Sequence, residues 1–319
     1  MINLEEKIKE YFQKKIYLSP HPLNRASEAG HPCLRYLVLS RTKNELKVLP
    51  DVNLQAIFEE GNIHEAAELR LLQEAGFRII EQQRAFEWKE KELSGRIDAI
   101  IVGEDGKRYP LEIKSCSPNA FRVVQKANNV MDLVRARYHR IRKYPAQIIL
   151  YMLMGNYEEG ILWFKEKVSG KRKQLNISLN DPEVLEYGES ILKKLEAVNE
   201  MIKKGEEPPA QQIDDCVDCP FERTACFPGL DFGEGADILD DNELLEKLDR
   251  LEELRDSKEE YDTIWSEIKE KFQGKSAIIG AKWMVESKKQ VRTEYQVPQD
   301  VKRQYATQKE IWVLNIQKL

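Results

Sequence analysis

Two short stretches, close together in the chain, decide the fold. Residues 95–102 read Gly-Arg-Ile-Asp-Ala-Ile-Ile-Val, and residues 111–115 read Leu-Glu-Ile-Lys-Ser. Both are apolar enough to form buried strands, yet the first carries Asp98 and the second carries Glu112 and Lys114. Because successive side chains of a strand point to opposite faces, Glu112 and Lys114 share one face. The pattern predicts a hairpin that holds charged side chains among core residues.

The turn between these strands predicts their register. Residues 104–106 read Glu-Asp-Gly, and a three-residue hairpin loop favours glycine at its last, left-handed position. Gly106 in that position places residue 103 opposite residue 107, and therefore Asp98 opposite Glu112. The turn thus predicts that the two carboxylates are neighbours.

A pair of neighbouring carboxylates predicts a metal site. The two charges repel and are costly to bury unless a cation lies between them. Mg²⁺ or Mn²⁺ prefers such oxygen ligands, and the ion would activate a water and neutralise a scissile phosphate. Lys114 would hold the attacking water or stabilise the phosphorane charge. The alternative is a hairpin with solvent-facing charges, but the apolar residues around Asp98 and Glu112 favour the site.

The composition sets broad limits on the class of protein. The chain has 319 residues, of which 41% are hydrophobic and 33% charged, so it can bury a substantial core. No apolar run approaches the roughly 20 residues that span a membrane, and residues 1–15 are too charged for a secretory signal. We therefore expect a cytoplasmic protein without a membrane partner.

Helical and strand patterns alternate along the chain and predict an α/β core. We expect strands at 77–80, 84–88, 93–102, 108–115 and 160–166, and helices at 1–15, 54–75, 120–142, 146–155 and 182–204. Residues 242–272 predict one long helix or a helical hairpin, followed by a β-hairpin at 276–286 and 290–297. These patterns suggest a catalytic domain at 1–230 and a C-terminal extension at 231–319.

A basic segment follows the two motifs. The net charge of −5 does not favour nucleic acid, but binding depends on local patches. A charge run is usually a solvated helix face, yet this one precedes a further motif described below, so we expect its cations to bind DNA phosphates. Phe121 and Tyr138 are candidates for stacking on bases. The cations in question are Arg122, Lys126, Arg135, Arg137, Arg140 and Arg142.

The order of Asp98, Glu112-x-Lys114 and then Gln147-x-x-x-Tyr151 resembles the RecB-like branch of the PD-(D/E)XK nucleases. The resemblance implies a restriction-endonuclease-like core, with a mixed central sheet flanked by helices, and these five residues as its catalytic set. Gln147 and Tyr151 are one helical turn apart and share a face. In the family this pair orients substrate and supports the lysine; the alternative is a polar helix start and a core tyrosine.

The same resemblance implies a set of metal ligands. The branch carries a histidine on an upstream helix, and Gly-Asn-Ile-His-Glu at 61–65 matches that motif. The implied ligands of Mg²⁺ or Mn²⁺ are therefore His64, Asp98, Glu112 and the backbone carbonyl of Ile113. A lone helical histidine is otherwise more often structural.

The five cysteines point to a second metal group. An odd count with a tight late trio favours metal or cluster ligation over disulfides in a reducing cytoplasm. Cys33 together with Cys216, Cys219 and Cys226 resembles the iron–sulfur members of the branch, which include AddB-type and CRISPR-associated RecB-like exonucleases. The resemblance implies a [4Fe–4S] cluster on these four thiolates; a structural Zn²⁺ is the alternative. Cys116 is expected to be a packing residue.

These features together predict a Mg²⁺- or Mn²⁺-dependent deoxyribonuclease. We expect an exonuclease that hydrolyses DNA ends or single strands in recombination, repair or phage replication, in the last case in the host cytoplasm. One alternative is a CRISPR-associated nuclease that trims DNA before spacer integration. The other is a non-catalytic, cluster-bearing DNA-binding module, which the complete catalytic set disfavours. The C-terminal extension is expected to contact DNA, a recombination or replication partner, or a second copy of the chain.

Overall fold

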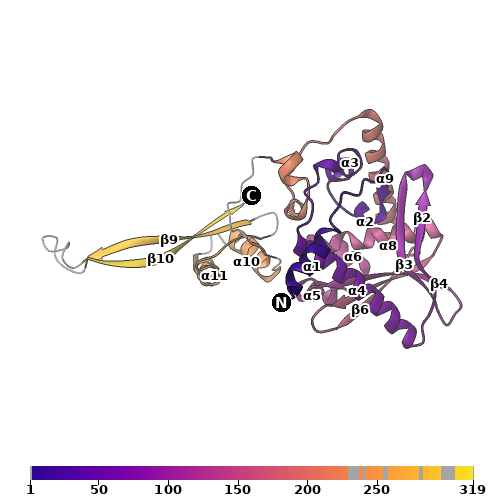
Figure 1. Ribbon diagram of the computed structural model, residues 1–319, viewed down its shortest axis with the longest axis horizontal. Coiled ribbons are helices and arrows are strands. Elements are labelled where there is room, and N and C mark those ends of the chain that lie inside the picture. The colour runs from indigo at the N-terminus through magenta and orange to yellow at the C-terminus, as the bar shows by residue number, and fades with distance from the viewer. Residues whose placement is uncertain are drawn as a thin grey trace. The chain divides into compact units, whose positions relative to one another are not determined.

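The chain forms two compact units in the computed structural model (Figure 1). One comprises residues 1–211 and 218–228, and the other comprises residues 212–217 and 229–319. The predicted boundary between residues 230 and 231 lies outside the part that the structure describes. The described residues are 2–228, 237–239, 242–253, 258–279, 283–295 and 306–318.

A six-stranded sheet organises the first unit. Its order is β1-β3-β4-β5-β6, and β2 pairs with β3 outside this path. β3 is antiparallel to β2 and β4, β4 is parallel to β5, and β5 is antiparallel to β6. The predicted mixed central sheet is therefore confirmed. The strands are β1 (Asn24–Arg25), β2 (Arg78–Trp88), β3 (Leu93–Val102), β4 (Arg108–Cys116), β5 (Glu159–Glu166) and β6 (Arg172–Ser178).

The hairpin of β3 and β4 has the predicted register. Ala99 pairs with Leu111 and Val102 pairs with Arg108. This is the register in which residue 103 lies opposite residue 107. The Gly103 N–H donates to the Lys107 carbonyl at 2.9 Å. Gly106 has φ +79°, which is the left-handed conformation that the turn prediction assigned to this glycine.

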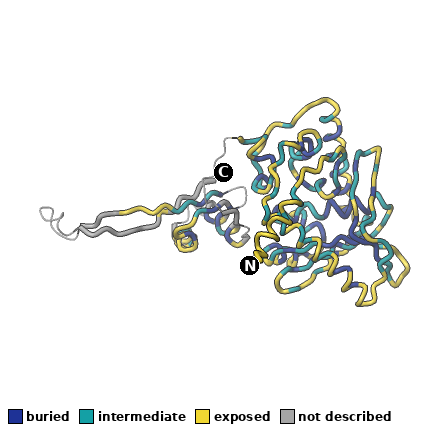
Figure 2. The backbone as a smooth tube through the Cα atoms, in the orientation of Figure 1, coloured by how far each residue is buried: buried dark blue, intermediate teal, exposed yellow. Residues whose placement is uncertain are grey.

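Helices cover both faces of this sheet. α4 packs Leu69 and Leu72 against the face that carries Leu111 and Ile113. The other face carries the main core, through which α8 passes, and Figure 2 shows this region as mostly buried. The helices are α1 (Leu4–Gln13), α2 (Ala26–Ala29), α3 (Leu34–Thr42), α4 (Val52–Glu74), α5 (Pro118–Lys126), α6 (Val130–Val134), α7 (His139–Arg142), α8 (Tyr144–Gly155) and α9 (Pro182–Lys204). Short turns are η1 (Asn44–Leu46), η2 (Lys89–Lys91), η3 (Asp214–Asp218) and η4 (Glu222–Cys226).

The helical segment predicted over 120–142 is helical, but it forms three separate helices, α5, α6 and α7. Asn129 starts α6 through a capping box, in which its side chain accepts from the Asp132 N–H and Asp132 accepts from the Asn129 N–H. The strands expected at 77–80 and 84–88 form one strand, β2, with a register shift between Ile79 and Glu81. β6 was not predicted, because only Leu175 and Ile177 of this strand are buried.

The second unit has its own sheet and core. Its helical region is the hairpin alternative, α10 (Asn242–Glu253) followed by α11 (Lys258–Lys271). The strands are β7 (Asp237–Leu239), β8 (Ser276–Ile279), β9 (Trp283–Tyr295) and β10 (Ala306–Lys318), in the order β10-β9-β8-β7. The predicted hairpin of 276–286 and 290–297 is wrong, because residues 286–290, where its turn was expected, lie inside β9. β9 pairs with β8 on one edge and with β10 on the other. Its described core consists of Leu244, Leu248, Leu251, Ile268, Phe272, Ala277, Ile279, Trp283 and Val285.

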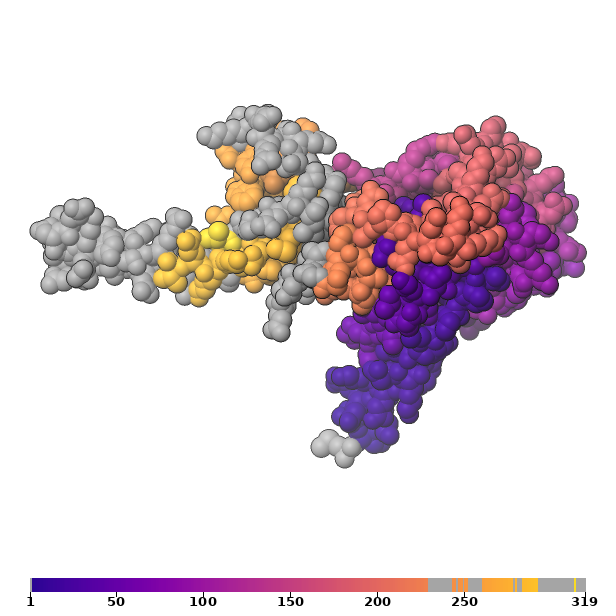
Figure 3. All heavy atoms as spheres, turned by 90° about the horizontal axis from the view of Figure 1, so that it is seen from above, coloured from indigo at the N-terminus to yellow at the C-terminus, as the bar shows by residue number. Residues whose placement is uncertain are grey.

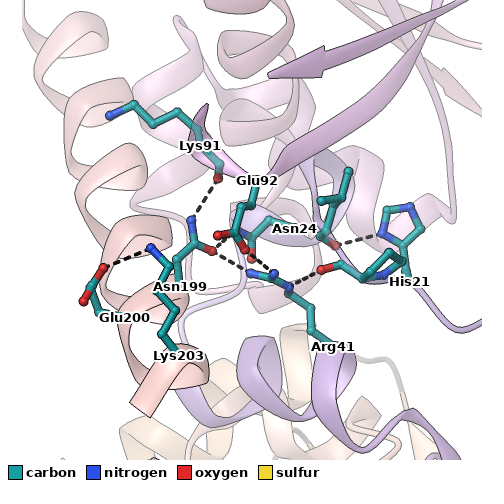
Figure 4. A network of polar contacts seen from close by, with 10 residues as sticks. His21, Asn24, Arg41, Lys91, Glu92, Asn199, Glu200 and Lys203 are labelled. Atoms are coloured by element: carbon teal, nitrogen blue, oxygen red, sulfur yellow. Dashed lines mark hydrogen bonds and ion pairs between the residues drawn. The ribbon is translucent and has the colours of Figure 1, made fainter. Parts of the chain in front are cut away.

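The side chain of Arg41 joins α3 to α9 (Figure 4). Arg41 donates to the Asn199 side-chain oxygen at 2.6 Å, to Glu92 at 2.6 Å and to the Pro22 carbonyl at 2.8 Å. Asn24 donates to the same Asn199 oxygen at 2.8 Å. This network connects β1, α3, α9 and the turn before β3.

Among the described residues, no helix has the length and apolar character of a membrane span.

Replacing Arg41 with methionine is expected to lower the free energy of unfolding by about 2–4 kcal/mol, because it leaves a partly buried Glu92 without this donor and removes one of the two donors to the buried Asn199 oxygen. Urea denaturation followed by circular dichroism measures this. Arg70→Met is the matched control, since the Arg70 side chain is 78% exposed and pairs with the exposed Glu74 at 3.4 Å. The control should change stability by less than about 0.5 kcal/mol. Equal effects of the two variants would show that the network contributes nothing.

Candidate active site

The candidate site lies where one edge of β3 has a gap. β2 pairs along the whole of β3, so β1 and β4 share its other edge. On this second edge, β1 pairs with residues 93–94 and β4 pairs with residues 99–102. Residues 95–98 between them have no strand partner on that edge among the described strands. The gap exposes backbone groups that need partners, and side chains supply them.

Asp98 and Tyr151 fill this gap. The Asp98 carboxylate accepts the Ile113 N–H at 2.7 Å, where a backbone carbonyl of β3 would otherwise be expected. The Tyr151 hydroxyl accepts the Arg96 N–H at 3.2 Å and the Gln147 amide at 3.2 Å. The predicted Gln147–Tyr151 pair is therefore hydrogen-bonded and contacts β3 directly.

The predicted carboxylate pair is buried and incompletely satisfied. Asp98 is 9% exposed and Glu112 is 1% exposed. Glu112 Oε1 accepts from Lys114 Nζ at 2.6 Å, whereas Glu112 Oε2 is buried without any hydrogen-bond partner. Burial raises the pKa of Glu112 to about 8, and Asp98 adds to the rise against the opposing effect of Lys114. Burial likewise raises the pKa of Asp98. Lys114 alone therefore does not offset the cost of burying the two carboxylates.

Lys114 supplies the cation nearest to this pair. Burial alone would lower its pKa, but the carboxylates of Glu112 and Asp98 outweigh this effect and raise it. The Lys114 side chain therefore stays charged. Its Nζ lies 5.3 Å from the ring centroid of Tyr144, at the start of α8, which is within the range of a cation–π contact. Sequence reasoning did not find this role of Tyr144.

Sequence reasoning also missed Glu65 and Gln83. Gln83 faces Asp98 on β2, since its neighbours Gln82 and Arg84 pair with Ala99 and Ile97. Its φ of +52° is left-handed, a conformation that costs a non-glycine residue about 1–3 kcal/mol and gathers at functional sites. The Gln83 amide donates to Glu65 and also hydrogen-bonds Asp98. Nothing in a glutamine's sequence context signals such a backbone.

α4 presents Glu65, not His64, to the carboxylate pair. Burial and then the charge of Asp98 raise the pKa of Glu65. His64 Nδ1 instead lies 3.1 Å from Lys165 Nζ. Burial and then Lys165 lower the pKa of His64. The structure therefore brings Glu65, Asp98, Glu112 and Lys114 together and leaves His64 beside a lysine.

An unpartnered oxygen of Glu112 makes the carboxylates of this site suitable ligands for a divalent cation. Within the described residues, no three or more His, Cys, Asp or Glu side chains are arranged as a metal site. Glu112 Oε2 is nevertheless a buried, partnerless carboxylate oxygen next to a second buried carboxylate, that of Asp98. Carboxylate oxygens are the ligands that Mg²⁺ and Mn²⁺ prefer. The residues present fit such an ion.

Several predicted DNA contacts have protein partners. Arg135 forms an ion pair with Glu183, and Arg140 binds Asp218 through two hydrogen bonds of 2.6 and 2.8 Å. Arg122 and Lys126 are exposed on α5, Arg137 is exposed before α7, and Arg142 is half-buried. The predicted stacking residues Phe121 and Tyr138 are 4% and 5% exposed, so that prediction is wrong.

Three of the four predicted cluster cysteines belong to the first unit. Cys33 starts α3, and its Sγ accepts the Tyr36 N–H at 3.3 Å. Burial raises the pKa of the Cys33 thiol, and the charge of Cys226 adds to the rise, so these two cysteines are neighbours. Cys219 acts electrostatically on Tyr36. Cys216 lies in residues 212–217, which group with the second unit.

Residues 218–228 are held against α3 and η1. Arg35 donates to the Ala225 carbonyl at 3.2 Å, Thr224 donates to the Leu46 carbonyl at 2.6 Å, and the Val48 N–H donates to Pro220 at 2.9 Å. Figure 3 shows this orange segment against the indigo N-terminal residues. Cys116 is buried in the main core, as expected for a packing residue.

No family model matches this sequence, and no curated protein matches it. Distant matches exist among solved structures. The structure of SSO0001 has a TM-score of 0.41 at 17% identity, covering 72% of this chain and 95% of that one. An alkaline exonuclease, LHK-Exo, from Laribacter hongkongensis has a TM-score of 0.33 at 14% identity, covering 61% and 97%. A phage-related exonuclease from Haemophilus somnus 129PT has a TM-score of 0.31 at 12% identity, covering 59% and 97%.

Gly95→Ala is expected to lower the free energy of unfolding by about 1–3 kcal/mol. A Cβ at Gly95 would lie 2.5 Å from Tyr151 Cε1 and 2.9 Å from the Ala26 Cβ, so the tyrosine that fills the gap must move. Gly61→Ala is the control, because a Cβ there meets nothing within 4 Å. It should stabilise α4 by roughly 0.5–1 kcal/mol. Urea denaturation compares the two variants, and a stabilising Gly95→Ala would contradict the close packing of Tyr151.

Proposed function

We propose that this chain is a metal-dependent DNA exonuclease that hydrolyses phosphodiester bonds at DNA ends or on single strands. The observation that carries the proposal is Glu112 Oε2, a buried carboxylate oxygen without a partner beside the buried Asp98. A charged lysine on the same strand completes the arrangement. Two carboxylates and a lysine in a strand gap form a reaction centre for phosphate esters, whose transition state gains negative charge.

Asp98 and Glu112 would hold Mg²⁺ or Mn²⁺, with Glu65 as the further carboxylate on α4. When bound, the ion supplies a water of lowered pKa and offsets charge on the scissile phosphate. Lys114 Nζ, which stays charged, donates a hydrogen bond to the attacking water or to a phosphate oxygen. Tyr144 packs along the lysine and limits its rotamers, which keeps Nζ directed at the carboxylates.

Gln147 and Tyr151 position the catalytic strand in this scheme. The Tyr151 hydroxyl holds the Arg96 N–H, two residues before Asp98, and Gln147 orients that hydroxyl. Gln83 acts on the opposite edge of β3 by joining Asp98 to Glu65. The Asp98 carboxylate is thus fixed from both edges of its own strand. His64 and the Ile113 carbonyl are further proposed ligands.

Glu112→Gln and Lys114→Ala should each lower the rate of DNA hydrolysis by about a thousandfold, because the first removes a carboxylate that would hold the metal ion and the second removes positive charge that the transition state needs. The assay follows a fluorescently labelled linear DNA with Mg²⁺ or Mn²⁺ under single-turnover conditions. Glu87→Gln is the matched control, since Glu87 is an exposed carboxylate on β2. It should cleave at the wild-type rate. A covalently closed circular DNA separates an exonuclease, which leaves it intact, from an endonuclease.

Full hydrolysis by Glu112→Gln would reject the site. DNA binding without any metal-dependent cleavage by the wild-type protein would favour the non-catalytic module. Comparing Glu65→Gln with His64→Ala then identifies the α4 ligand, because the structure directs only Glu65 at Asp98.

We further propose that Cys33, Cys216, Cys219 and Cys226 hold a [4Fe–4S] cluster in a reducing cytoplasm. The support is the chemistry of the donors together with the neighbouring positions of Cys33 and Cys226. The cluster would join the start of α3 to the segment after α9, adding covalent links to the contacts of Arg35 and Thr224.

Anaerobically purified protein should then contain about four iron atoms per chain and absorb broadly in the visible range. Cys33→Ser should lose both signals. Cys116→Ala is the control, since Cys116 lies in the apolar core, and it should keep them. Colourless protein that contains zinc in place of iron would reject the cluster and favour the zinc alternative.

A further inference from the structure

The turn between β5 and β6 carries an unusual density of cations. Residues 165–173 contain Lys165, Lys167, Lys171, Arg172 and Lys173, and we call this segment the basic hairpin. The turn itself is rigidly built. Glu166 accepts the backbone N–H groups of residues 168 and 169, and the glycine at 170 has φ +69°.

The two acidic residues near the basic hairpin, Glu166 and Glu68, are buried and already have hydrogen-bond or ion-pair partners. Glu166 is 4% exposed and its carboxylate caps the turn. Glu68 of α4 is 1% exposed and binds Arg172 at 2.7 Å and Lys165 at 3.5 Å. In contrast, no side-chain ion pair in the described part of the chain engages Lys167, Lys171 or Lys173. Within the described residues, no ion pair therefore offsets the positive charge at the tip of the basic hairpin.

The basic hairpin lies at the catalytic edge of the sheet. β4 and β5 are parallel, with Lys114 opposite Phe164 and Cys116 opposite Glu166, so both strands end at the same edge. The Lys167 N–H donates to the Cys116 carbonyl at 2.9 Å. Lys167 is three residues beyond the level of Lys114, which is about 10 Å along a strand.

Two further contacts connect the hairpin to the site. Lys173 pairs with Phe164, the cross-strand neighbour of Lys114, so Lys173 and Lys114 lie on the same face of the sheet. On the other face, Lys165 contacts His64, the residue before Glu65. The basic hairpin thus adjoins the end of β4 that carries Lys114 and the turn of α4 that carries His64 and Glu65.

We propose that the basic hairpin binds the phosphate backbone of the DNA strand that enters the active site, with Lys167 and Lys171 as its principal contacts. The proposal rests on the proposed nuclease function and adds a substrate-binding surface to it. Lysines at fixed positions on a rigid turn attract the backbone without reading bases, which suits an enzyme that acts on any sequence. Arg135 and Arg140 are bound by carboxylates and are less free to take this role.

The double variant Lys167→Ala/Lys171→Ala tests the surface. Fluorescence anisotropy measures its affinity for a fluorescein-labelled single-stranded oligonucleotide in EDTA, across a series of NaCl concentrations. We expect about tenfold weaker binding at low salt, and a slope of log K against log salt that is smaller in magnitude by about 1.4, as for two lost phosphate contacts on a single strand.

Lys107→Ala/Arg108→Ala is the matched control. It removes the same charge from exposed residues at the opposite end of β4, beside the hairpin turn of Gly106. The control should leave both affinity and salt slope unchanged, and both variants should keep the wild-type melting temperature. Unchanged binding by the Lys167/Lys171 variant, or equal loss in the control, would overturn the proposal.

The two proposals fail in distinguishable ways. If Glu112→Gln abolishes cleavage while the hairpin variant binds like the wild type, the active site stands and the binding surface is rejected. If Glu112→Gln cleaves normally while the hairpin variant binds weakly, the surface stands as a DNA-binding site and the nuclease assignment is rejected.

Discussion

The hydrogen bond from the Ile113 N–H to the Asp98 carboxylate is the constraint on which the site depends. It replaces a strand-to-strand backbone contact at the level where β3 and β4 part. One side chain therefore both repairs the sheet and faces the space that the parted strands leave. Tyr151 does the same for the Arg96 N–H, which explains why a tyrosine on α8 belongs to a site made from strands. The atoms that satisfy the backbone of the two strands are thus the same atoms that line the candidate site.

The parts of the fold set by local chemistry were predictable. Gly106 fixed the β3–β4 register because only one loop length places it in the left-handed position. The spacing of Gln147 and Tyr151 likewise fixed their shared helical face. The errors fall where tertiary contacts decide. A polar strand such as β6 is recognised only by the β5 strand that it pairs with.

The site shows the same division between local and tertiary information. Asp98, Glu112 and Lys114 follow from alternation along two strands. The choice between His64 and Glu65 depends on how α4 is rotated over the sheet, and a motif of adjacent residues does not encode that rotation. Gln83 is harder still to predict, since both its left-handed backbone and its hydrogen bonds to two carboxylates depend on contacts between distant segments. Its strain is visible only in three dimensions.

The partnerless oxygen of Glu112 has a consequence for the whole molecule. An unpaired, deeply buried acceptor penalises the folded state, and a ligand that binds only the folded state offsets that penalty through mass action. Any ion that occupies the site then raises the stability of the entire first unit, not only its reactivity. The availability of divalent metal would thereby set how long each copy survives proteolysis, and copies without metal would be removed first.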